Sequence, residues 1–429
     1  MVPASRGKTG ALFVLIGVGV VVATFVVGVT FASDIGVGAA TSPDDGQANL
    51  TLVGSQGGGA GLHKYGSVYL LSDDNVSWRL ADADSYFDVT ALDDGRVIAA
   101  FMDSGYTDCG PYTSPCARTG YRIIDPNAED GPVTVEEWSF PIRTMVNSEI
   151  HDVEPTESGE ILVADMEYER ILAVKDGEVT WQWEASSYYD APADPTKEDW
   201  LHINDVDVIG EDRYLVSVRN ANQVLVIERG SGVVDVINED TDGDGMGEPT
   251  LLRHQHNPQW LGEGAILVAD SENHRIVELH ENESGVWEVA WTVESAEGVD
   301  LFWPRDADRL PNGNTLITDS GNQRILEVNR TGSVVWSTKT DYIPYEADRL
   351  PVGELVGAPR SDATLTGTPE ISDVPVISPL LVAVRASYPL PYWFTEGYFV
   401  SIAFGLGAIL TGFGLATLDI VNRLHRRRL

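Results

Sequence analysis

Cysteine and basic residues are both scarce in this chain. Its 429 residues include 2 cysteines, and 28 lysines and arginines stand against 66 aspartates and glutamates. Two cysteines cannot supply the four ligands of a zinc finger. The formal net charge of −38 is opposite in sign to the positive surface that nucleic-acid binding requires, so we expect no nucleic-acid partner.

The acidity also favours a particular environment. Because 43% of the residues are hydrophobic, the chain has enough apolar material for a folded core, and its charge is not a sign of disorder. Its composition resembles that of proteins from salt-loving archaea, whose surface carboxylates hold water in concentrated salt. We therefore expect a haloarchaeal protein whose folding requires high salt.

Two long stretches without charge lie near the ends of the chain. Residues 11–32 and 397–418 are each long enough to cross a bilayer as a transmembrane helix. Small residues in both stretches, among them Gly17 and Gly407, would let the two helices pack closely. The alternative is that glycine is simply common in membrane spans. Basic residues flank the stretches on their outer sides: Arg6, Lys8, Arg423, Arg426, Arg427 and Arg428.

The positive-inside rule then predicts a two-pass protein of the cell membrane. Residues 1–10 and 419–429 would be cytoplasmic, and the region between the spans would be extracytoplasmic. That region divides into a linker (33–48), a folded domain (49–385) and a juxtamembrane segment (386–396). The alternative for the first stretch is a signal peptide cleaved near residues 38–40, which also exports the domain.

One sequence pattern recurs roughly every fifty residues within the domain. In the clearest copies a polar residue lies 14 positions before the end of a short apolar run, as His151 does before Ile161–Asp165. A second apolar run and a Trp-bearing run follow, as in Arg170–Val174 and Val179–Trp183. Repeats of this length with several short β-type runs are typical of propellers with four strands per blade. Further copies start at Asn204, His256 and Arg305, and partial copies at Phe87 and Tyr345.

These six copies predict an all-β fold, a six-bladed β-propeller flanked by an N-terminal and a C-terminal transmembrane helix. The last copy lacks later strands, whereas residues 50–53 and 67–71 are apolar runs without a polar start. Pairing the two ends of the domain would close the circle and remove exposed sheet edges. Asp–Arg pairs five residues apart, beginning at Asp165, Asp270 and Asp319, suit salt bridges between adjacent strands.

Equivalent repeat positions occupy equivalent places around a propeller, so the six starting residues should form a ring at one mouth of the central channel. In an extended strand, His202 lies on the same side as Asn204, and His254 on the same side as His256. Arg219 ends a strand of the blade that contains Asn204. Imidazoles and guanidiniums gathered around one pocket make a site for an anion.

At these residues the chain resembles the arylsulfotransferase (arylsulfate sulfotransferase) family. The resemblance is carried by His-x-Asn in Asp199–Val206, Ser-x-Arg in Leu215–Arg219 and Gln-His-Asn at Gln255–Asn257, and it covers roughly residues 50–380. It implies a nucleotide-independent enzyme that moves a sulfuryl group from a phenolic sulfate ester to a phenolic acceptor through a sulfated histidine. No cofactor is required for this reaction.

The resemblance also implies roles for single residues. The nucleophile would be His256, and His202, Asn204, Arg219 and His151 would complete the catalytic pocket. The predicted substrate contacts are Arg305, His254, Phe87 and Tyr345, the last two by flanking an aryl ring.

Two other hypotheses stay open. Segments 267–276 and 317–325 also resemble NHL-repeat propellers, one branch of which is a lyase that uses histidine-bound zinc. A metal-dependent enzyme with ligands His151, His202 and His256 is therefore one alternative. A non-catalytic surface binding protein is the other, and the sequence leaves the oligomeric state open.

Two local features complete the predictions. Asp240, Asp242 and Asp244 are spaced as in a calcium-binding loop, although Leu251 stands where an EF-hand has its closing glutamate. They are candidate ligands of a structural calcium ion, with an acidic surface loop as the alternative. Cys109 and Cys116 bound a short loop, and outside the cytoplasm we expect them to form a disulfide.

Overall fold

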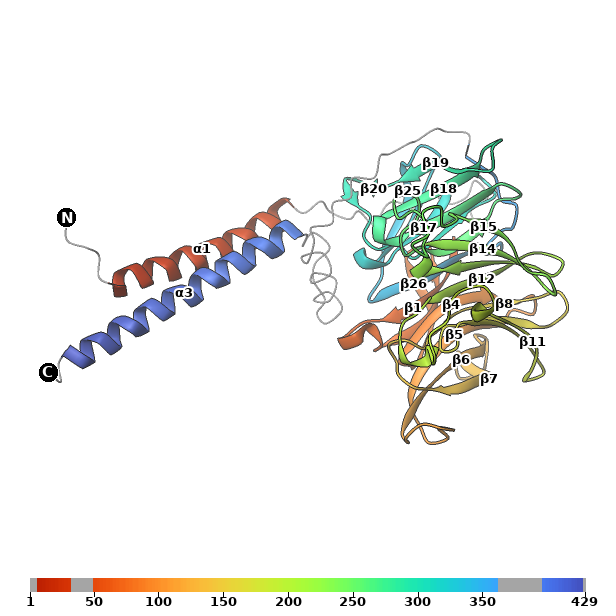
Figure 1. The fold of residues 1–429 in the computed structure, drawn as a ribbon, viewed down its shortest axis with the longest axis horizontal. Helices are drawn as coiled ribbons and strands as arrows, with labels where there is room; N and C mark the ends of the chain where they lie inside the picture. Colours follow the sequence, from red (N-terminus) through yellow and green to blue (C-terminus); the bar gives the residue numbers. More distant parts are fainter. Residues whose placement is uncertain (1–5, 32–48, 362–395, 427–429) are drawn as a thin grey trace. The chain divides into compact units, whose positions relative to one another are not determined.

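The computed structural model describes residues 6–31, 49–361 and 396–426, and the chain divides into two compact units (Figure 1). One unit contains the terminal helices, and the other, residues 35–371, contains the sheets. The predicted linker with its cleavage region at 38–40, residues 386–395 of the juxtamembrane segment, and Arg427 and Arg428 lie outside the described residues.

The helical unit contains two long apolar helices, α1 (Arg6–Phe31) and α3 (Glu396–Arg426). Within them, Lys8–Val27 and Gly397–Ile420 are long and apolar enough to cross a membrane, as the sequence predicted. These two helices are compatible with a membrane protein. The side of the membrane on which each end lies stays a prediction.

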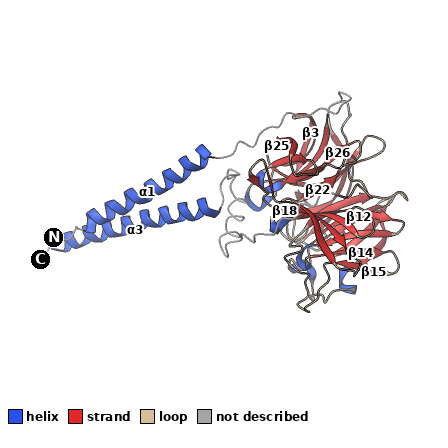
Figure 2. Ribbon diagram, turned by 90° about the horizontal axis from the view of Figure 1, so that it is seen from above, coloured by secondary structure: helices blue, strands red, loops and turns tan. Residues whose placement is uncertain are grey.

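Glycines allow the two helices to lie side by side (Figures 1 and 2). A Cβ atom added at Gly10 would fall 2.6 Å from the carbonyl oxygen of Gly412, and Gly17 faces Gly405 just as closely. Side chains at these positions would force the two backbones apart. The predicted packing role of Gly17 is confirmed, whereas Gly407 has open space around it.

The second unit is a six-bladed propeller of four-stranded antiparallel sheets, as predicted (Figure 2). Five blades use consecutive strands, from the inner strand outward. They are β4 (Ser85–Ala91), β5 (Val97–Tyr106), β6 (Cys116–Asp125) and β7 (Val133–Ile142); β8 (Ile150–Pro155), β9 (Ile161–Asp165), β10 (Arg170–Lys175) and β11 (Glu178–Glu184); β12 (Ile203–Gly210), β13 (Arg213–Val218), β14 (Gln223–Glu228) and β15 (Gly232–Ile237); β16 (His256–Trp260), β17 (Ala265–Asp270), β18 (Arg275–Glu281) and β19 (Trp287–Val293); and β22 (Asp306–Arg309), β23 (Thr315–Asp319), β24 (Arg324–Val328) and β25 (Val334–Lys339). A small hairpin of β20 (Ser295–Ala296) and β21 (Val299–Asp300) precedes the last of these blades.

The sixth blade joins the two ends of the domain. Its strand order is β26 (Ile343–Leu350), β1 (Leu50–Gly57), β2 (Gly66–Ser72) and β3 (Asn75–Ala83). The C-terminal copy therefore supplies the inner strand, and the N-terminal runs supply the three outer strands. The pairing of β26 with β1 closes the circle as predicted and protects both edges.

Apolar side chains fill the space between neighbouring blades. Trp291 and Trp336 are 0% and 1% exposed and belong to clusters that join two sheets. The three predicted Asp–Arg pairs all form, between Asp165 and Arg170, Asp270 and Arg275, and Asp319 and Arg324, at 2.6 to 2.7 Å across a hairpin. Their structural role is confirmed.

The inner strands carry an extra residue at the predicted ring. In five of the six strands the register with the neighbouring strand shifts by one residue. The shift falls between Tyr86 and Val89 in β4, Ile150 and Val153 in β8, Ile203 and Asp205 in β12, and His256 and Gln259 in β16, and at Tyr345 in β26. Such bulges bend a strand and re-aim its side chains.

Candidate active site

The predicted ring residues meet at the centre of the propeller, and all six are at most 5% exposed. The ring of Phe87 lies 4.9 Å from that of His151 and 5.3 Å from that of Tyr345. Tyr345 also stacks on His151 at 5.3 Å, lies 6.1 Å from His256, and has the guanidinium of Arg305 4.8 Å above its ring. Residues at the equivalent position of each sequence repeat therefore do lie together, as predicted.

Tyr345 is the central member of this ring, and Phe87 packs against it. Both are 0% exposed; Tyr345 stacks on His151, and Phe87 makes T-shaped contacts with His151 and Tyr345. Their predicted contact with an aryl ring stays a prediction, and it would require one of them to turn. The side chain of Asn204 is held by the segment before β16, because its Nδ2 donates to the carbonyl oxygen of Gln255 at 2.9 Å.

His202 joins the ring from just before β12. Its φ angle is +55°, so the extended conformation that we expected for it is wrong. The imidazole nevertheless stacks on His151 at 5.1 Å. Its Nδ1 lies 2.8 Å from Oδ1 of Asp199, which leaves Nε2 as the nitrogen with the lone pair when the ring is neutral.

The same left-handed turn occurs two residues before the ring position in the next two blades. His254 has φ +47° and Trp303 has φ +52°, so His254 is not extended either. A polar residue of the preceding blade holds each turn by accepting a hydrogen bond from its backbone N–H. The pairs are Glu169 with His202 at 2.7 Å, Asn222 with His254 at 3.0 Å and His274 with Trp303 at 3.2 Å. Sequence reasoning missed these three acceptors, although each directly precedes the same strand of its repeat.

His256 has a defined proton arrangement. Its Nδ1 lies 2.8 Å from Oγ of Ser271 and 3.2 Å from the carbonyl oxygen of His254. A carbonyl oxygen only accepts, and Oγ of Ser271 donates its own proton to the carbonyl oxygen of Pro304 at 2.7 Å. Nδ1 must therefore carry the proton. Nε2 keeps the lone pair, and no described residue forms a hydrogen bond with it.

Two arginines give the site positive charge. Arg305 donates to Oε1 of Gln56, and Arg219 donates to Oδ1 of Asn220 at 2.8 Å. Neither forms an ion pair with a carboxylate among the described residues, in contrast to the hairpin arginines. Burial, together with nearby Arg219, lowers the pKa of Arg305 to about 10, so Arg305 stays charged at neutral pH.

The histidines of the ring are neutral at pH 7. Burial, followed by the charges of Arg305 and Arg219, holds the pKa of His256 well below its usual range. Burial also lowers the pKa of His151 and of His202. The pKa of His254 falls to about 3 through burial and the nearby Arg219. Neutral imidazoles beside fixed guanidiniums provide nucleophiles and bases within an anion-binding pocket.

A buried carboxylate also faces this cluster. Glu149 is 5% exposed, and its Oε1 lies 3.1 Å from Nε2 of His63. Burial would raise its pKa, but the hydrogen bond with His63 and the neighbouring histidines lower it to about 2. His63 belongs to the β1–β2 connection, outside the repeat pattern, so no signal in the sequence pointed to this pair.

Cys109 and Cys116 form the predicted disulfide, in the β5–β6 connection. A hollow of about 770 Å³ lies beside it, lined in part by Tyr112, Arg143 and Met145. Strands β4, β5, β6 and β7 pair in that order and are antiparallel. The β5–β6 connection and the end of β7 at residue 142 therefore lie at the end of the blade where β4 begins, and the ring residue Phe87 lies near the start of β4. The hollow therefore opens at the same end of the propeller as the ring.

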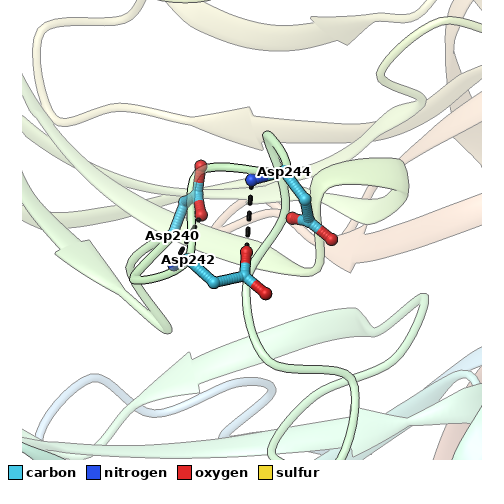
Figure 3. A group of neighbouring side chains, drawn as sticks. All are labelled: Asp240, Asp242 and Asp244. Atoms are coloured by element: carbon cyan, nitrogen blue, oxygen red, sulfur yellow. Dashed lines mark hydrogen bonds between the residues drawn. The ribbon is translucent and has the colours of Figure 1, made fainter.

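The predicted calcium loop brings its three carboxylates together (Figure 3). One oxygen from each of Asp240, Asp242 and Asp244 lies within 4.8 Å of the others. The oxygens already accept backbone hydrogen bonds, for example Asp240 from the amides of Gly243 and Gly245 at 2.7 and 2.9 Å. These bonds lower the pKa of Asp240. Calcium binding at this exposed loop stays a prediction.

The three histidines of the alternative zinc site are not gathered into a ready ligand set. Among the described residues, His151, His202 and His256 do not bring three ring nitrogens within 4.8 Å of one another. Nδ1 of His256 is directed at Ser271, and Nδ1 of His202 at Asp199. Both contacts leave Nε2 of these two histidines available, so the metal-dependent enzyme stays open as an alternative.

Comparison with known proteins finds a family match for part of the chain. The arylsulfotransferase (ASST) family model matches residues 142–341. No curated protein matches the chain.

Distant similarity to solved propellers accompanies the family match. A protein of unknown function from Bacteroides caccae is 18% identical with a TM-score of 0.49, over 70% of this chain and 98% of that one. A periplasmic gluconolactonase from Pseudomonas aeruginosa is 13% identical with a TM-score of 0.40, over 70% and 98%. Virginiamycin B lyase from Staphylococcus aureus is 11% identical with a TM-score of 0.36, over 62% and 70%.

Similarity to these structures at such levels says nothing of activity. The family match is more specific, because residues 142–341 include His151, Asn204, His256 and Arg305, four of the six ring residues. Over this segment, the six-bladed propeller therefore matches the arylsulfotransferase family, as its sequence motifs indicated.

Proposed function

We propose that this protein is a membrane-anchored arylsulfotransferase. It would transfer a sulfuryl group from a phenolic sulfate ester to a phenolic acceptor through sulfated His256, without a nucleotide or other cofactor. The observation that carries the proposal is the state of His256. Its Nδ1 is fixed as a donor, and its Nε2 lone pair is free of described partners beside two arginines without carboxylate partners.

In the first half-reaction, Nε2 of His256 attacks the sulfur of the aryl sulfate. The N–S bond forms, the S–O bond to the aryl group breaks, and the phenolate leaves with the bonding electrons. Negative charge spreads over the sulfuryl oxygens and the leaving oxygen during this step. Arg305 and Arg219 stabilise that charge, because their charges are not spent on carboxylates of the protein.

In the second half-reaction, the acceptor phenol attacks the same sulfur. The N–S bond breaks, and the lone pair returns to Nε2 of His256. His202 is suited to take the proton of the acceptor, since its Nδ1 is held by Asp199 at 2.8 Å and burial keeps the imidazole neutral. Asp199 would then stabilise the imidazolium that forms. The hollow beside the disulfide lies at this end of the propeller, and an aryl group would enter from there.

The proposal is tested by mass spectrometry of the full chain in detergent, in high salt, after mixing with a phenyl sulfate donor. We expect one added SO₃ group on His256, stable to alkali, with release of one equivalent of phenol. His256→Ala should show neither change. His280→Ala is the matched control, because His280 lies on β18 and binds Glu278 away from the ring.

A folded protein that gains no SO₃ group and releases no phenol would contradict the proposal. The remaining hypotheses would then be a metal-dependent enzyme and a non-catalytic binding protein, and metal analysis of the same sample would separate them. An adduct on another residue, retained in His256→Ala, would contradict the assignment of the nucleophile while leaving the activity in place.

A further inference from the structure

Carboxylates line the channel beyond the ring. The inner strands begin at the ring, and their following residues run toward the opposite mouth. A cavity of about 100 Å³ lies there, lined by residues of β4, β8, β12, β16 and β26 and of the segment after β26. Its carboxylates include Asp88, Asp152, Asp205, Asp207, Glu346 and Asp348, and these residues define the carboxylate end of the channel.

In three of the six blades the carboxylate after the ring residue is held by the next blade. Asp88 accepts a hydrogen bond from the backbone N–H of Val153 at 3.2 Å, and Asp152 accepts one from Val206 at 2.6 Å. Asp306 does the same with Ala347 at 3.0 Å. Each donor lies two residues after the ring residue of its own blade. This bond ties neighbouring inner strands together.

Asp205 lacks this bond because proline stands at the donor position. The residue two after His256 is Pro258, which has no N–H to donate. Oδ2 of Asp205 is accordingly buried without a hydrogen-bond partner, and Asp205 is only 4% exposed. The sequence of β16 thus releases one carboxylate oxygen of β12 from the pattern.

Two more oxygens without partners line the same cavity. Oδ2 of Asp207 and Oδ1 of Asn257 are buried and accept no hydrogen bond, and both residues are 8% exposed. Asp207 lies two residues after Asp205 and so shares its side of β12. The amide oxygen of Asn257 is left without a partner because Nδ2 is directed at Glu346, at 3.3 Å. An amide oxygen adds an acceptor without adding charge.

From this arrangement we infer that the carboxylate end of the channel binds a calcium ion through Asp205, Asp207 and Asn257. Unpartnered buried oxygens are costly, and an ion with oxygen ligands satisfies them. The lining residues offer carboxylate and amide oxygens but no imidazole or thiol, which selects a hard cation. Calcium tolerates six to eight oxygens in irregular geometry, whereas magnesium demands a near-octahedral site.

The size of the cavity fits a partly hydrated ion. One water molecule needs roughly 10–15 Å³ of such space, and the cavity provides about 100 Å³. Three carboxylates do not converge here as they do in the loop of Asp240, so the ion would keep part of its water shell. Bound there, it would join β12 to β16, and through water to Glu346 on the closing strand β26.

Calcium titration of the full chain in detergent, after chelator treatment, tests this site by calorimetry. Titrations with magnesium and sodium are run in parallel. The double variant Asp205→Asn, Asp207→Asn should weaken the binding of calcium on the order of 100-fold, because ligand charge sets calcium affinity over several decades. The matched control removes the other acidic cluster, with Asp240→Asn, Asp242→Asn and Asp244→Asn. It should retain this binding event.

A second variant guards against a folding defect. Asn257→Gly removes the amide oxygen without changing charge, and glycine tolerates the φ of +35° at this position. It should also weaken calcium binding, by roughly tenfold. Calcium should raise the melting temperature of the wild-type chain by more than that of either channel variant.

Three results would overturn the inference. They are the absence of calcium binding up to millimolar concentration, unchanged affinity in the channel variants, and loss of all binding in the loop control. Tighter binding of magnesium or sodium than of calcium would overturn the identity of the ion. None of these results depends on sulfuryl transfer, so the site stands or falls separately from the proposed activity.

Discussion

The two ends of the channel differ sharply in charge, although neighbouring residues of the same strands build them. His151 and Asn204 belong to the ring, whereas the residues that follow them, Asp152 and Asp205, line the carboxylate end. At the ring end buried bases are kept neutral beside Arg305, and at the other end buried acids lie close to one another. Tyr345, which is packed in the ring, senses both ends. Burial raises its pKa, and the carboxylates of Asp205, Glu346 and Asp152 raise it further.

The difference teaches how a repeat separates two tasks. The copies keep an acidic residue or an asparagine directly after the ring position and vary the ring residue itself. Bulges at the ring position then send the two residues to different parts of the channel. One end thereby gathers imidazoles and guanidiniums, and the other carries an interblade hydrogen bond that recurs in three blades and that Pro258 removes from a fourth.

Removing the proposed nucleophile should have the largest effect on the ring end. We expect His256→Ala to reduce phenol release from phenyl sulfate by at least about 10³-fold, since no other group replaces a covalent nucleophile. Initial rates of phenol release, measured by absorbance, check this. Activity within tenfold of the wild type would contradict the role of His256.

Removing one positive charge should have the next largest effect. Arg305→Ala is expected to lower kcat by about 10²–10³-fold, because a buried donor to the developing charge is lost. Arg305→Lys should recover part of the rate, since it restores the charge without the paired donors. Equal rates for the two variants would show that Arg305 acts only through packing on Tyr345.

Under the proposed function, Ser271 would position the nucleophile His256 without touching the reacting atoms. Ser271→Ala removes one of the two acceptors of Nδ1–H of His256 and should lower kcat by roughly tenfold with little change in KM. Ser271→Thr keeps the hydroxyl and should recover activity. A change confined to KM, measured by steady-state kinetics, would contradict a positioning role.

Acid should affect the two ends in opposite directions. Burial, followed by the charge of Asp306, raises the pKa of Asp348 to about 7, so its contribution to stability is present below its ordinary pKa of 3.8 and is lost as pH rises toward 7. In chelator, Asp348→Asn should therefore melt a few degrees above the wild type at pH 8 and close to it at pH 4. Melting curves monitored by circular dichroism check the sign.

At the ring end the sign reverses. Burial lowers the pKa of His151, so its contribution to stability is present above the ordinary pKa of 6.5 and is lost as pH falls. His151→Gln should therefore gain stability relative to the wild type as pH falls below 6.5. A parallel shift of both variants with pH, in the same melting experiment, would refute the contrast between the ends.

The smallest effect is expected in the helical unit. Gly17→Leu should separate α1 from α3 without changing the propeller, because the added side chain would meet the backbone at Gly405. Cross-linking of cysteines introduced into the two helices should fall, while phenol release stays unchanged. The matched control is Gly407→Leu, at a position with open space.

The sequence by itself determined the blade number, the closure of the circle and the members of the ring. These follow from the repeat, since residues at one phase must occupy equivalent places in a closed array. The predicted spans, the disulfide and the Asp–Arg pairs also followed from local spacing and composition. The haloarchaeal origin, the high-salt requirement and the membrane topology stay predictions.

Only the tertiary structure decided how the side chains use those places. The left-handed turns at His202 and His254, the proton on Nδ1 of His256 and the pairing of Glu149 with His63 depend on groups far apart in the chain. So does the unpartnered oxygen of Asp205, because it depends on a proline in the next blade. A periodic pattern fixes where a residue lies, whereas hydrogen-bond partners come from whichever strand packs beside it.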